Sequence, residues 1–216
     1  VDYVIPFKKI DEARKAKEEW KGSEDVLLLG EEFGKKPDGF DMNTSPRKMT
    51  REKVENKAVI YRSTNLTRVL DSCDEAEKIL IGGITNSKAI AGHLNEKRPE
   101  KVEIIACGTR NEEAVLINEE FGIECDSRNE ISLEDIIGAG AILHHLDYDN
   151  ITDMGLVTQL AYESPEWKEK IRESCIFRAS QDLGIEKDIP QCLEENESKT
   201  VPVVEDGKIR SYSSTV

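Results

Sequence analysis

The chain has 216 residues, of which 38% are hydrophobic and 34% are charged, and its formal net charge at pH 7 is −14. A hydrophobic fraction of this size is typical of a folded protein and excludes a disordered chain. The negative charge argues against nucleic-acid binding, because proteins hold phosphate backbones through clustered lysine and arginine. An acidic protein also repels small anions, so a phosphate-ester ligand would need a metal ion, backbone amides or a few cations at its site.

The five cysteines are scattered and include no Cys-x-x-Cys pair. This spacing predicts reduced thiols and argues against a disulfide framework or a zinc site. The sequence shows no signal peptide and no apolar run long enough to cross a membrane. We therefore expect a cytoplasmic protein that binds neither membranes nor nucleic acid, and leave open whether it forms a homo-oligomer.

The first predicted elements form a strand-helix-strand unit. A short apolar strand covers Tyr3–Phe7, a helix opens at Asp11, and a buried strand over Val26–Leu29 ends at Gly30. Apolar residues in short runs predict strands, and apolar residues at helical spacing predict the helix between them. Two strands joined in this way are most simply a parallel βαβ unit.

The same order of elements returns in residues 77–108. A strand covers Ile79–Ile81, a helix opens at Asn86 or Ser87, and a strand over 102–106 ends at Gly108. This copy follows another strand at 58–61 and a polar turn at 62–68, and the first copy has no such lead. We therefore predict a duplicated unit, with a core strand and turn that precede Val1 in the parent protein.

The C-terminal part is predicted to be helical and to end in a hairpin. Residues 132–135 read as a capping box before an apolar helix at 136–146, whose Gly-Ala-Gly-Ala run indicates close packing against a neighbour. Further helices are expected at 153–162, 164–184 and from 188, and Asp206-Gly207 is a typical hairpin turn. The predicted fold class is α/β, a three-layer α/β/α arrangement with two similar βαβ-type halves. The expected parts are 1–52, 53–150 and 151–216, packed as one unit.

Ligands of parallel α/β sheets bind beyond the carboxyl ends of the strands, and the segment 30–46 follows one such end. Glu31 and Asp41 offer hard oxygen ligands for a metal ion, and Ser45 offers a hydroxyl. The alternative is a surface loop whose polar residues only make turns.

Two other segments carry suitable side chains. In the turn after the strand at 58–61, Thr64, Asn65 and Thr67 can donate hydrogen bonds to a phosphate or sulfonate that Arg68 would clamp. Such hydroxyls are also ordinary helix caps. Glu134 and Asp135 could hold magnesium, or could simply complement the dipole of the helix that follows them.

A series of short motifs keeps its order along nearly the whole chain: Leu29-Gly30-Glu31, Gly39-Phe40-Asp41, Ser45-Pro46, Ser63-Thr64-Asn65, Thr67-Arg68, Asn86, Leu133-Glu134-Asp135, Ala139-Gly140-Ala141-Ile142, Leu183-Gly184, Val201-Pro202 and Asp206-Gly207. In this order they resemble the 2-phosphosulfolactate phosphatase family. The resemblance implies an α/β fold with two similar halves, dependence on magnesium, and release of phosphate from a small sulfonated ester in coenzyme M biosynthesis.

Three positions depart from the pattern of that family. Glu32 stands where the family has arginine, Thr44 lies in a motif that usually reads Gly-Asn-Ser-Pro, and Leu66 replaces a glycine. Glu32 reverses the charge at a place where an anion would bind, and leucine disfavours a positive φ.

The leading hypothesis is a magnesium-dependent phosphatase for a small anionic phosphomonoester, most simply 2-phosphosulfolactate, with Asp41 and Glu31 as catalytic residues. The predicted metal ligands are Glu31, Asp41, Glu134 and Asp135. The predicted ligands of phosphate or sulfonate are Ser45, Thr64, Asn65, Thr67, Arg68 and Asn86. The alternatives are an inactive relative that binds a small anion or a protein partner, and a metal-dependent hydrolase of another ester.

Overall fold

The structure, a computed structural model, describes residues 1–22, 25–73, 75–109, 119–122 and 131–212. The chain forms two units. Unit 1 contains Val1–Ile79 and Pro202–Val216, and unit 2 contains Leu80–Val201. The expected boundaries near residues 52 and 150 stay a prediction.

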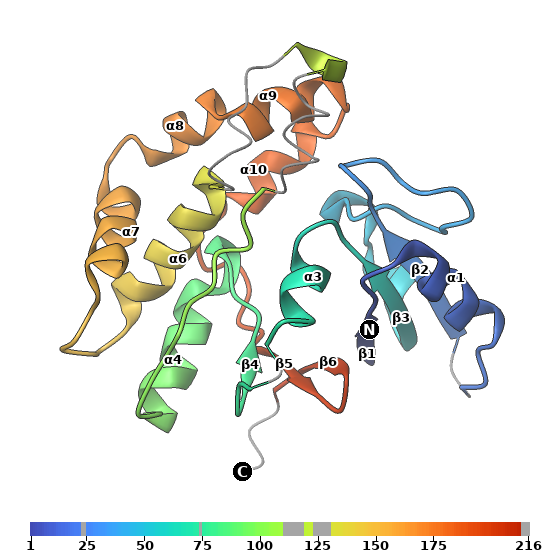
Figure 1. Ribbon diagram of the computed structural model, residues 1–216, viewed down its shortest axis with the longest axis horizontal. Helices are drawn as coiled ribbons and strands as arrows, with labels where there is room; N and C mark the ends of the chain where they lie inside the picture. Colours follow the sequence, from blue (N-terminus) through green and yellow to red (C-terminus); the bar gives the residue numbers. More distant parts are fainter. Residues whose placement is uncertain (23–24, 74, 110–118, 123–130, 213–216) are drawn as a thin grey trace. The chain divides into compact units, whose positions relative to one another are not determined.

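The sheet has the strand order β2-β3-β1-β6-β5-β4 (Figure 1). Its strands are β1 (Tyr3–Pro6), β2 (Asp25–Gly30), β3 (Lys57–Arg62), β4 (Ile79–Leu80), β5 (Pro202–Glu205) and β6 (Lys208–Ser211). β3 runs parallel to both β1 and β2, whereas β6 is antiparallel to β1 and β5. The sheet is therefore mixed, and β3 lies between the two strands of the first predicted βαβ unit.

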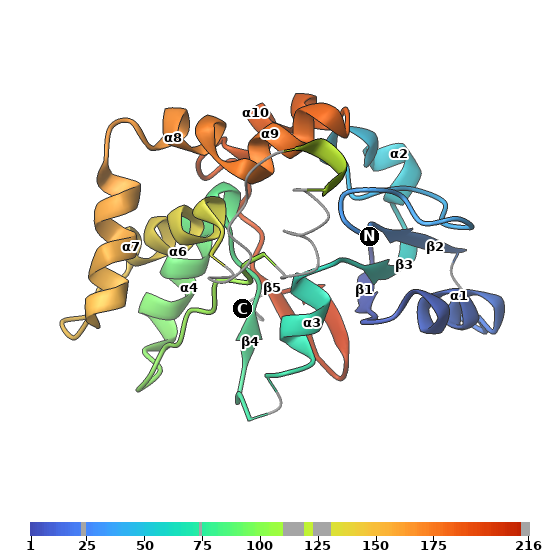
Figure 2. The same cartoon turned by 45° about the horizontal axis from the view of Figure 1, so that its top comes forward.

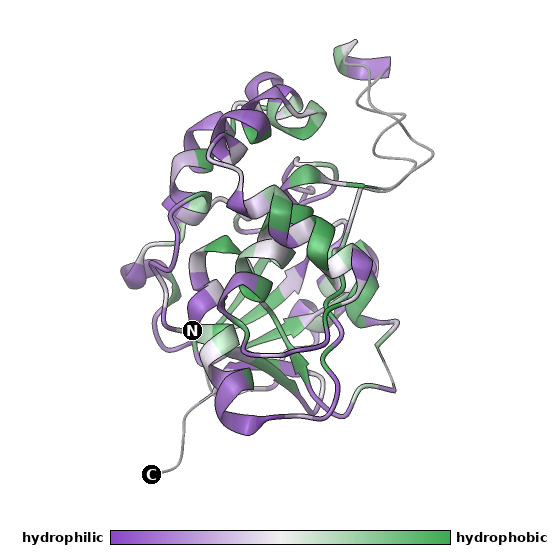
Figure 3. Ribbon diagram, turned by 90° about the vertical axis from the view of Figure 1, so that its left-hand side faces the viewer, coloured by the Kyte–Doolittle hydropathy of each residue, from purple (hydrophilic) through white to green (hydrophobic). Residues whose placement is uncertain are grey.

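The core of unit 1 lies between this sheet and α1 (Ile10–Glu18). Ala13 of α1 packs with Leu28, Phe40 and Ile60, all buried. Three successive residues of β3, from Ala58 to Ile60, are at most 3% exposed, as expected of a strand covered on both faces. In Figure 3 the strands of the sheet are coloured largely as hydrophobic.

The loop after β2 covers the outer edge of that strand. Asp41 N donates to Leu28 O at 2.9 Å, and Gly30 N donates to Met42 O at 3.1 Å. The edge of β2 is thus paired with the protein's own backbone, which removes a template for aggregation. The remaining short helices of unit 1 are η1 (Pro46–Lys48), α2 (Arg51–Val54) and α3 (Leu66–Leu70).

Unit 2 is mainly helical. The helices whose bounds the structure describes are η2 (Ile84–Asn86), α4 (Ser87–Lys97), α6 (Leu133–His145), α7 (Asp153–Glu163), α8 (Trp167–Glu173), α9 (Cys175–Asp182), η3 (Glu186–Asp188) and α10 (Ile189–Cys192). Figures 1 and 2 show α6 between α4 and α7. Buried side chains of α6, α8 and the segments around them form its main core: Ile84, Ile137, Trp167, Ile171 and Leu193.

Glycine explains how closely α6 and α7 pack. A Cβ atom added at Gly140 would lie 2.0 Å from the carbonyl oxygen of Thr158 on α7. Only glycine fits at that contact, so the close packing predicted from the Gly-Ala-Gly-Ala run is confirmed.

The α/β fold class is confirmed, as are the strands β1 to β4 and the terminal hairpin. At the hairpin turn Asp206 and Gly207 have φ of 50° and 70°, which matches the backbone that an Asp-Gly pair favours. The predicted strand at 102–106 is wrong, because residues 101–109 form neither helix nor strand. A strand needs a neighbour for its backbone hydrogen bonds, and this segment pairs with none in the described part of the chain. Among all the residues that the structure describes, no helix is both long and apolar enough to cross a membrane.

Candidate active site

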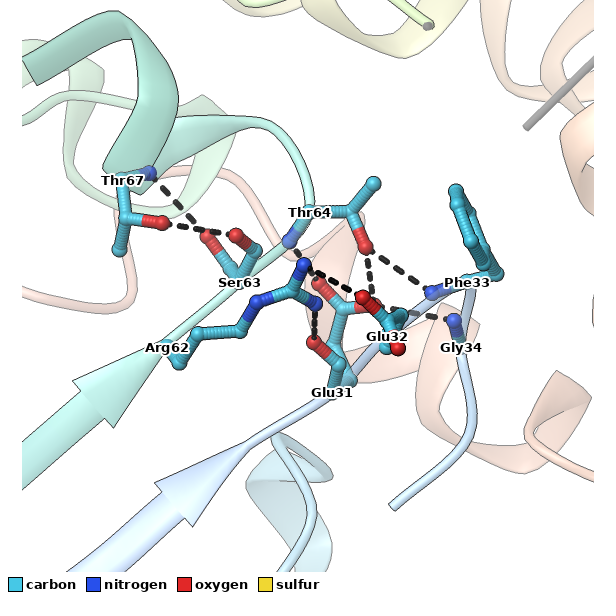
Figure 4. A network of polar contacts seen from close by, with 8 residues as sticks. All are labelled: Glu31, Glu32, Phe33, Gly34, Arg62, Ser63, Thr64 and Thr67. Atoms are coloured by element: carbon cyan, nitrogen blue, oxygen red, sulfur yellow. Dashed lines mark hydrogen bonds and ion pairs between the residues drawn. The ribbon is translucent and has the colours of Figure 1, made fainter. Parts of the chain in front are cut away.

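A network of polar contacts lies where the parallel strands β2 and β3 end (Figure 4). Gly30 is in register with Arg62, so the residues that follow them, Glu31 and Ser63, leave the sheet at the same level. Glu31 Oε1 accepts a hydrogen bond from Thr64 N at 2.6 Å, and Oε2 accepts from Thr64 Oγ1 at 2.8 Å and from Gly34 N at 2.9 Å. Two residues predicted separately for the site are therefore in direct contact.

The Glu31 carboxylate and the Thr64 hydroxyl also fix the turn at residues 32–35. Glu32 and Lys35 exchange two backbone hydrogen bonds, and the central residues Phe33 and Gly34 have φ of 49° and 76°. A positive φ is unfavourable for phenylalanine. Phe33 N donates to Thr64 Oγ1 at 2.9 Å, so Thr64 helps to hold this residue in its strained conformation.

Arg62, the last residue of β3, places a buried cation beside the network. Its side chain is 5% exposed; Nη1 donates to the carbonyl oxygen of Glu31 and Nη2 donates to Glu32 Oε1 at 2.9 Å. Sequence reasoning missed this residue. The available signal was an arginine at the end of an apolar strand, because arginine is rarely buried without a partner.

The hydroxyls around the start of α3 serve the backbone. Thr67 N donates to Ser63 Oγ at 3.3 Å, and Thr67 Oγ1 donates to Ser63 O at 2.7 Å. Asn65 precedes the helix, and Arg68 is partly buried on it, with a buried Nε that has no hydrogen-bond partner within the described ranges. Leu66 begins the helix and is not among the residues with positive φ, so leucine is compatible with this turn. Roles of these residues in phosphate binding stay predictions.

Asp41 and Ser45 lie on the loop after β2. Both carboxylate oxygens of Asp41 accept from Lys17 Nζ at 2.6 Å, and Oδ2 also accepts from Leu28 N at 2.8 Å. Leu28 is three residues before Glu31, which corresponds to about 10 Å along a strand. Asp41 thus anchors the edge of β2 outside the Glu31–Thr64 network. Its predicted catalytic role stays a prediction, as does phosphate binding by Ser45, which is buried just before η1.

The remaining predicted residues belong to unit 2. Glu134 and Asp135 lie in the first turn of α6 and line a cavity of about 350 Å³, together with Gly83, Cys107 and several apolar side chains. Asp135 Oδ2 accepts from Gly108 N at 2.7 Å. Burial raises the pKa of the Asp135 carboxyl, and the Gly108 hydrogen bond only partly opposes this. A carboxyl with a raised pKa in a cavity is typical of functional sites.

One expectation near these residues is wrong, and a second stays a prediction. The predicted capping box at 132–135 is wrong, because the Ser132 side chain makes no capping bond and instead contacts the Thr109 hydroxyl. Asn86 accepts from Gly83 N at 2.8 Å and donates to the carbonyl oxygens of Ile81 and Thr200 at 3.2 and 3.1 Å. Its amide therefore links segments of unit 2, and phosphate binding by Asn86 stays a prediction.

The residues present are compatible with magnesium, although not with a cage built by the protein alone. No three His, Cys, Asp or Glu side chains come together within the described ranges. Mg²⁺, however, is usually held by one or two carboxylates and completes its octahedron with water and substrate oxygens. Glu31 fits this mode because its three hydrogen bonds use three of about four acceptor positions of a carboxylate.

Comparison with known proteins gives the family. The model of the 2-phosphosulpholactate phosphatase family matches residues 1–207. The chain belongs to the 2-phosphosulfolactate phosphatase family. Similar proteins, each described as "probable 2-phosphosulfolactate phosphatase", come from Clostridium perfringens strain SM101 (32% identity over 99% of this chain and 81% of that protein), Thermotoga petrophila (31% over 94% and 79%) and Clostridium acetobutylicum (28% over 95% and 81%).

Membership of the 2-phosphosulfolactate phosphatase family confirms the resemblance read from the sequence motifs. Two of the departures from the family pattern now have structural explanations. Glu32 is the ionic partner of Arg62, and Leu66 takes a helical conformation. Nothing in the structure explains Thr44.

Proposed function

We propose that this chain hydrolyses 2-phosphosulfolactate to sulfolactate and inorganic phosphate, with Mg²⁺ as its cofactor. Family membership supports the activity and the substrate. The observation that carries the proposal in the structure is the Glu31 carboxylate, which Thr64 and Gly34 hold at the carboxyl ends of β2 and β3. Parallel α/β sheets bind their ligands at such ends.

Each residue of the network has a distinct task in this proposal. Glu31 would hold the metal ion through Oε1, the oxygen with a single hydrogen bond. Thr64 and Gly34 fix the direction of that carboxylate, so that little reorganisation is needed when the ester binds. Arg62 supplies a positive charge next to Glu31, in a protein whose net charge of −14 otherwise repels the ester.

When bound, Mg²⁺ would neutralise phosphoryl oxygens and lower the pKa of a water molecule. The predicted contacts of Asp41, Ser45, Glu134 and Asp135 with metal or ester stay predictions.

The test is phosphate release from 2-phosphosulfolactate and from an aryl phosphate, in Mg²⁺ and in EDTA. We expect release from 2-phosphosulfolactate in Mg²⁺, a fall of at least about a hundredfold in EDTA, and recovery after Mg²⁺ is restored. Equal rates in both buffers would overturn the role of magnesium. Release from the aryl ester alone would overturn the substrate.

The second candidate function is an inactive relative that binds a small anion. The pairing of Arg62 with Glu32 favours it, because a cation that is already neutralised attracts an anionic ester less strongly. The same assay separates the two candidates, since the inactive relative would bind phosphate or the ester and release none in either buffer.

A further inference from the structure

Arg62 and Glu32 form an ion pair whose two members differ sharply in exposure. The arginine side chain is 5% exposed and the glutamate side chain is 43% exposed. The guanidinium belongs to the end of β3, whereas the carboxylate comes from the turn at 32–35 (Figure 4). One member is therefore fixed in the protein, and the other can exchange with solvent.

The guanidinium has a hydrogen-bond donor that could serve an oxyanion. Nη1 donates a hydrogen bond to the carbonyl oxygen of Glu31. Nη2 makes one bond, to Glu32 Oε1, and the buried Nε has no hydrogen-bond partner within the described ranges. Arginine binds carboxylate, phosphate or sulfonate oxygens most strongly through two parallel N–H donors. The single bond to Glu32 uses only part of this capacity.

A buried guanidinium cannot simply lose its counter-ion. Removing one partner of a buried ion pair is strongly destabilising, because it leaves a charge without compensation. Exchange of one anion for another avoids that penalty. Glu32 can leave Arg62 at low cost only when another oxyanion takes its place.

We propose that Glu32 is an internal competitor for the anion site of Arg62, and that a tetrahedral oxyanion of the substrate displaces it. Arg62 is then a specificity-determining residue, and Glu32 sets how tightly the anion binds. The inference rests on the proposed function only for the source of the oxyanion, which is either the phosphate or the sulfonate of the ester. The position of the Glu32 carboxylate beside Arg62 marks where that group would lie.

The experiment measures binding of inorganic phosphate and of methanesulfonate, separately, to the wild type and to Glu32→Gln by calorimetry. Removal of the competing charge should tighten binding of the group that occupies this site by at least about threefold, because even an exposed ion pair contributes up to about 1 kcal/mol. The anion whose affinity changes identifies the group that Arg62 recognises.

Glu55→Gln is the matched control. Glu55 pairs with Arg51 in the same unit, and its side chain is also 43% exposed. Both variants change the net charge by the same amount, so a general charge effect would tighten binding in both. Unchanged or weaker binding in Glu32→Gln, or equal tightening in both variants, would overturn the inference.

A second measurement does not depend on Glu32. The Nε–H resonance of Arg62 should shift on titration with the recognised anion, and Arg62→Lys should weaken binding about tenfold, because lysine lacks the paired donors. An unmoved resonance at saturation would contradict the proposal even if Arg62→Lys does not fold. These outcomes concern binding alone, so they are distinct from failure of phosphate release, which would overturn the proposed function.

Discussion

The side chain of Thr64 connects the ends of β2 and β3, as that of Arg62 also does. Its hydroxyl accepts from Phe33 N at 2.9 Å and donates to Glu31 Oε2 at 2.8 Å, and the residue is 3% exposed. Thr64→Val keeps the shape of the side chain and removes both hydrogen bonds. It leaves the Phe33 amide and one carboxylate oxygen without these partners.

The expected loss of stability follows from the two bonds. A neutral hydrogen bond contributes about 1 kcal/mol and one to a charged group about 1.5–3 kcal/mol. Phe33 and Glu31 are only partly buried, so water compensates some of the loss. We expect the free energy of unfolding to fall by about 2–3 kcal/mol. Phosphate release should fall about tenfold or more, because Glu31 loses part of its orientation.

Urea unfolding followed by circular dichroism measures the change, and hydrogen exchange of the Phe33 amide locates it. Thr64→Ser is the control, because it keeps the hydroxyl and loses one methyl group, at a cost of about 1 kcal/mol. If Thr64→Val lies within about 0.5 kcal/mol of the wild type, with unchanged exchange at Phe33, the network does not hold the two strand ends.

Three further changes test other parts of the fold. Gly140→Ala should destabilise unit 2 by about 2–3 kcal/mol in urea unfolding, because the new Cβ would lie 2.0 Å from the Thr158 carbonyl oxygen. Among the described residues, the new Cβ of Gly138→Ala would approach Gly83 Cα alone, at 3.9 Å. This variant should be neutral or stabilising, so equal losses of stability in the two variants would contradict the packing. Asp41→Asn should lower the free energy of unfolding by about 1 kcal/mol, because it weakens the ion pair with Lys17. A stability equal to that of the wild type would show that the pair does not anchor the loop. Burial raises the pKa of Asp135 in the folded protein. The stability that the protonated carboxyl contributes is therefore fully present below the unfolded pKa of about 3.9 and is lost as pH rises through the folded pKa. Asp135→Asn, which is always neutral, should therefore gain melting temperature relative to the wild type as pH rises from 3 to 8, and a constant difference would refute the burial effect.

The local patterns of the sequence were sufficient for much of the fold. Short apolar runs predicted β1, β2 and β3, and Asp206-Gly207 predicted the hairpin, because these signals depend on neighbouring residues. The strand at 102–106 failed for a different reason. Its Val102 and Ile104 alternate with Glu103 as in a strand, but a strand also requires a partner, which no local pattern reports.

The closeness of Glu31 and Thr64 was predictable, because topology alone brings these two residues together. Glu31 and Thr64 follow two parallel strands in register, so the sheet places them side by side. The partners of single charged groups were not predictable. The lysine of α1 that binds Asp41 and the pairing of Glu32 with Arg62 depend on contacts between residues 24 and 30 positions apart.

The most direct test of the site is the rate of phosphate release from 2-phosphosulfolactate by the wild type and by Glu31→Gln, at saturating Mg²⁺ and with circular dichroism to confirm that both are folded. If Glu31 holds the metal ion at the ends of β2 and β3, the variant should lose at least about a hundredfold in kcat. A folded Glu31→Gln enzyme that releases phosphate as fast as the wild type would show that the active centre lies elsewhere.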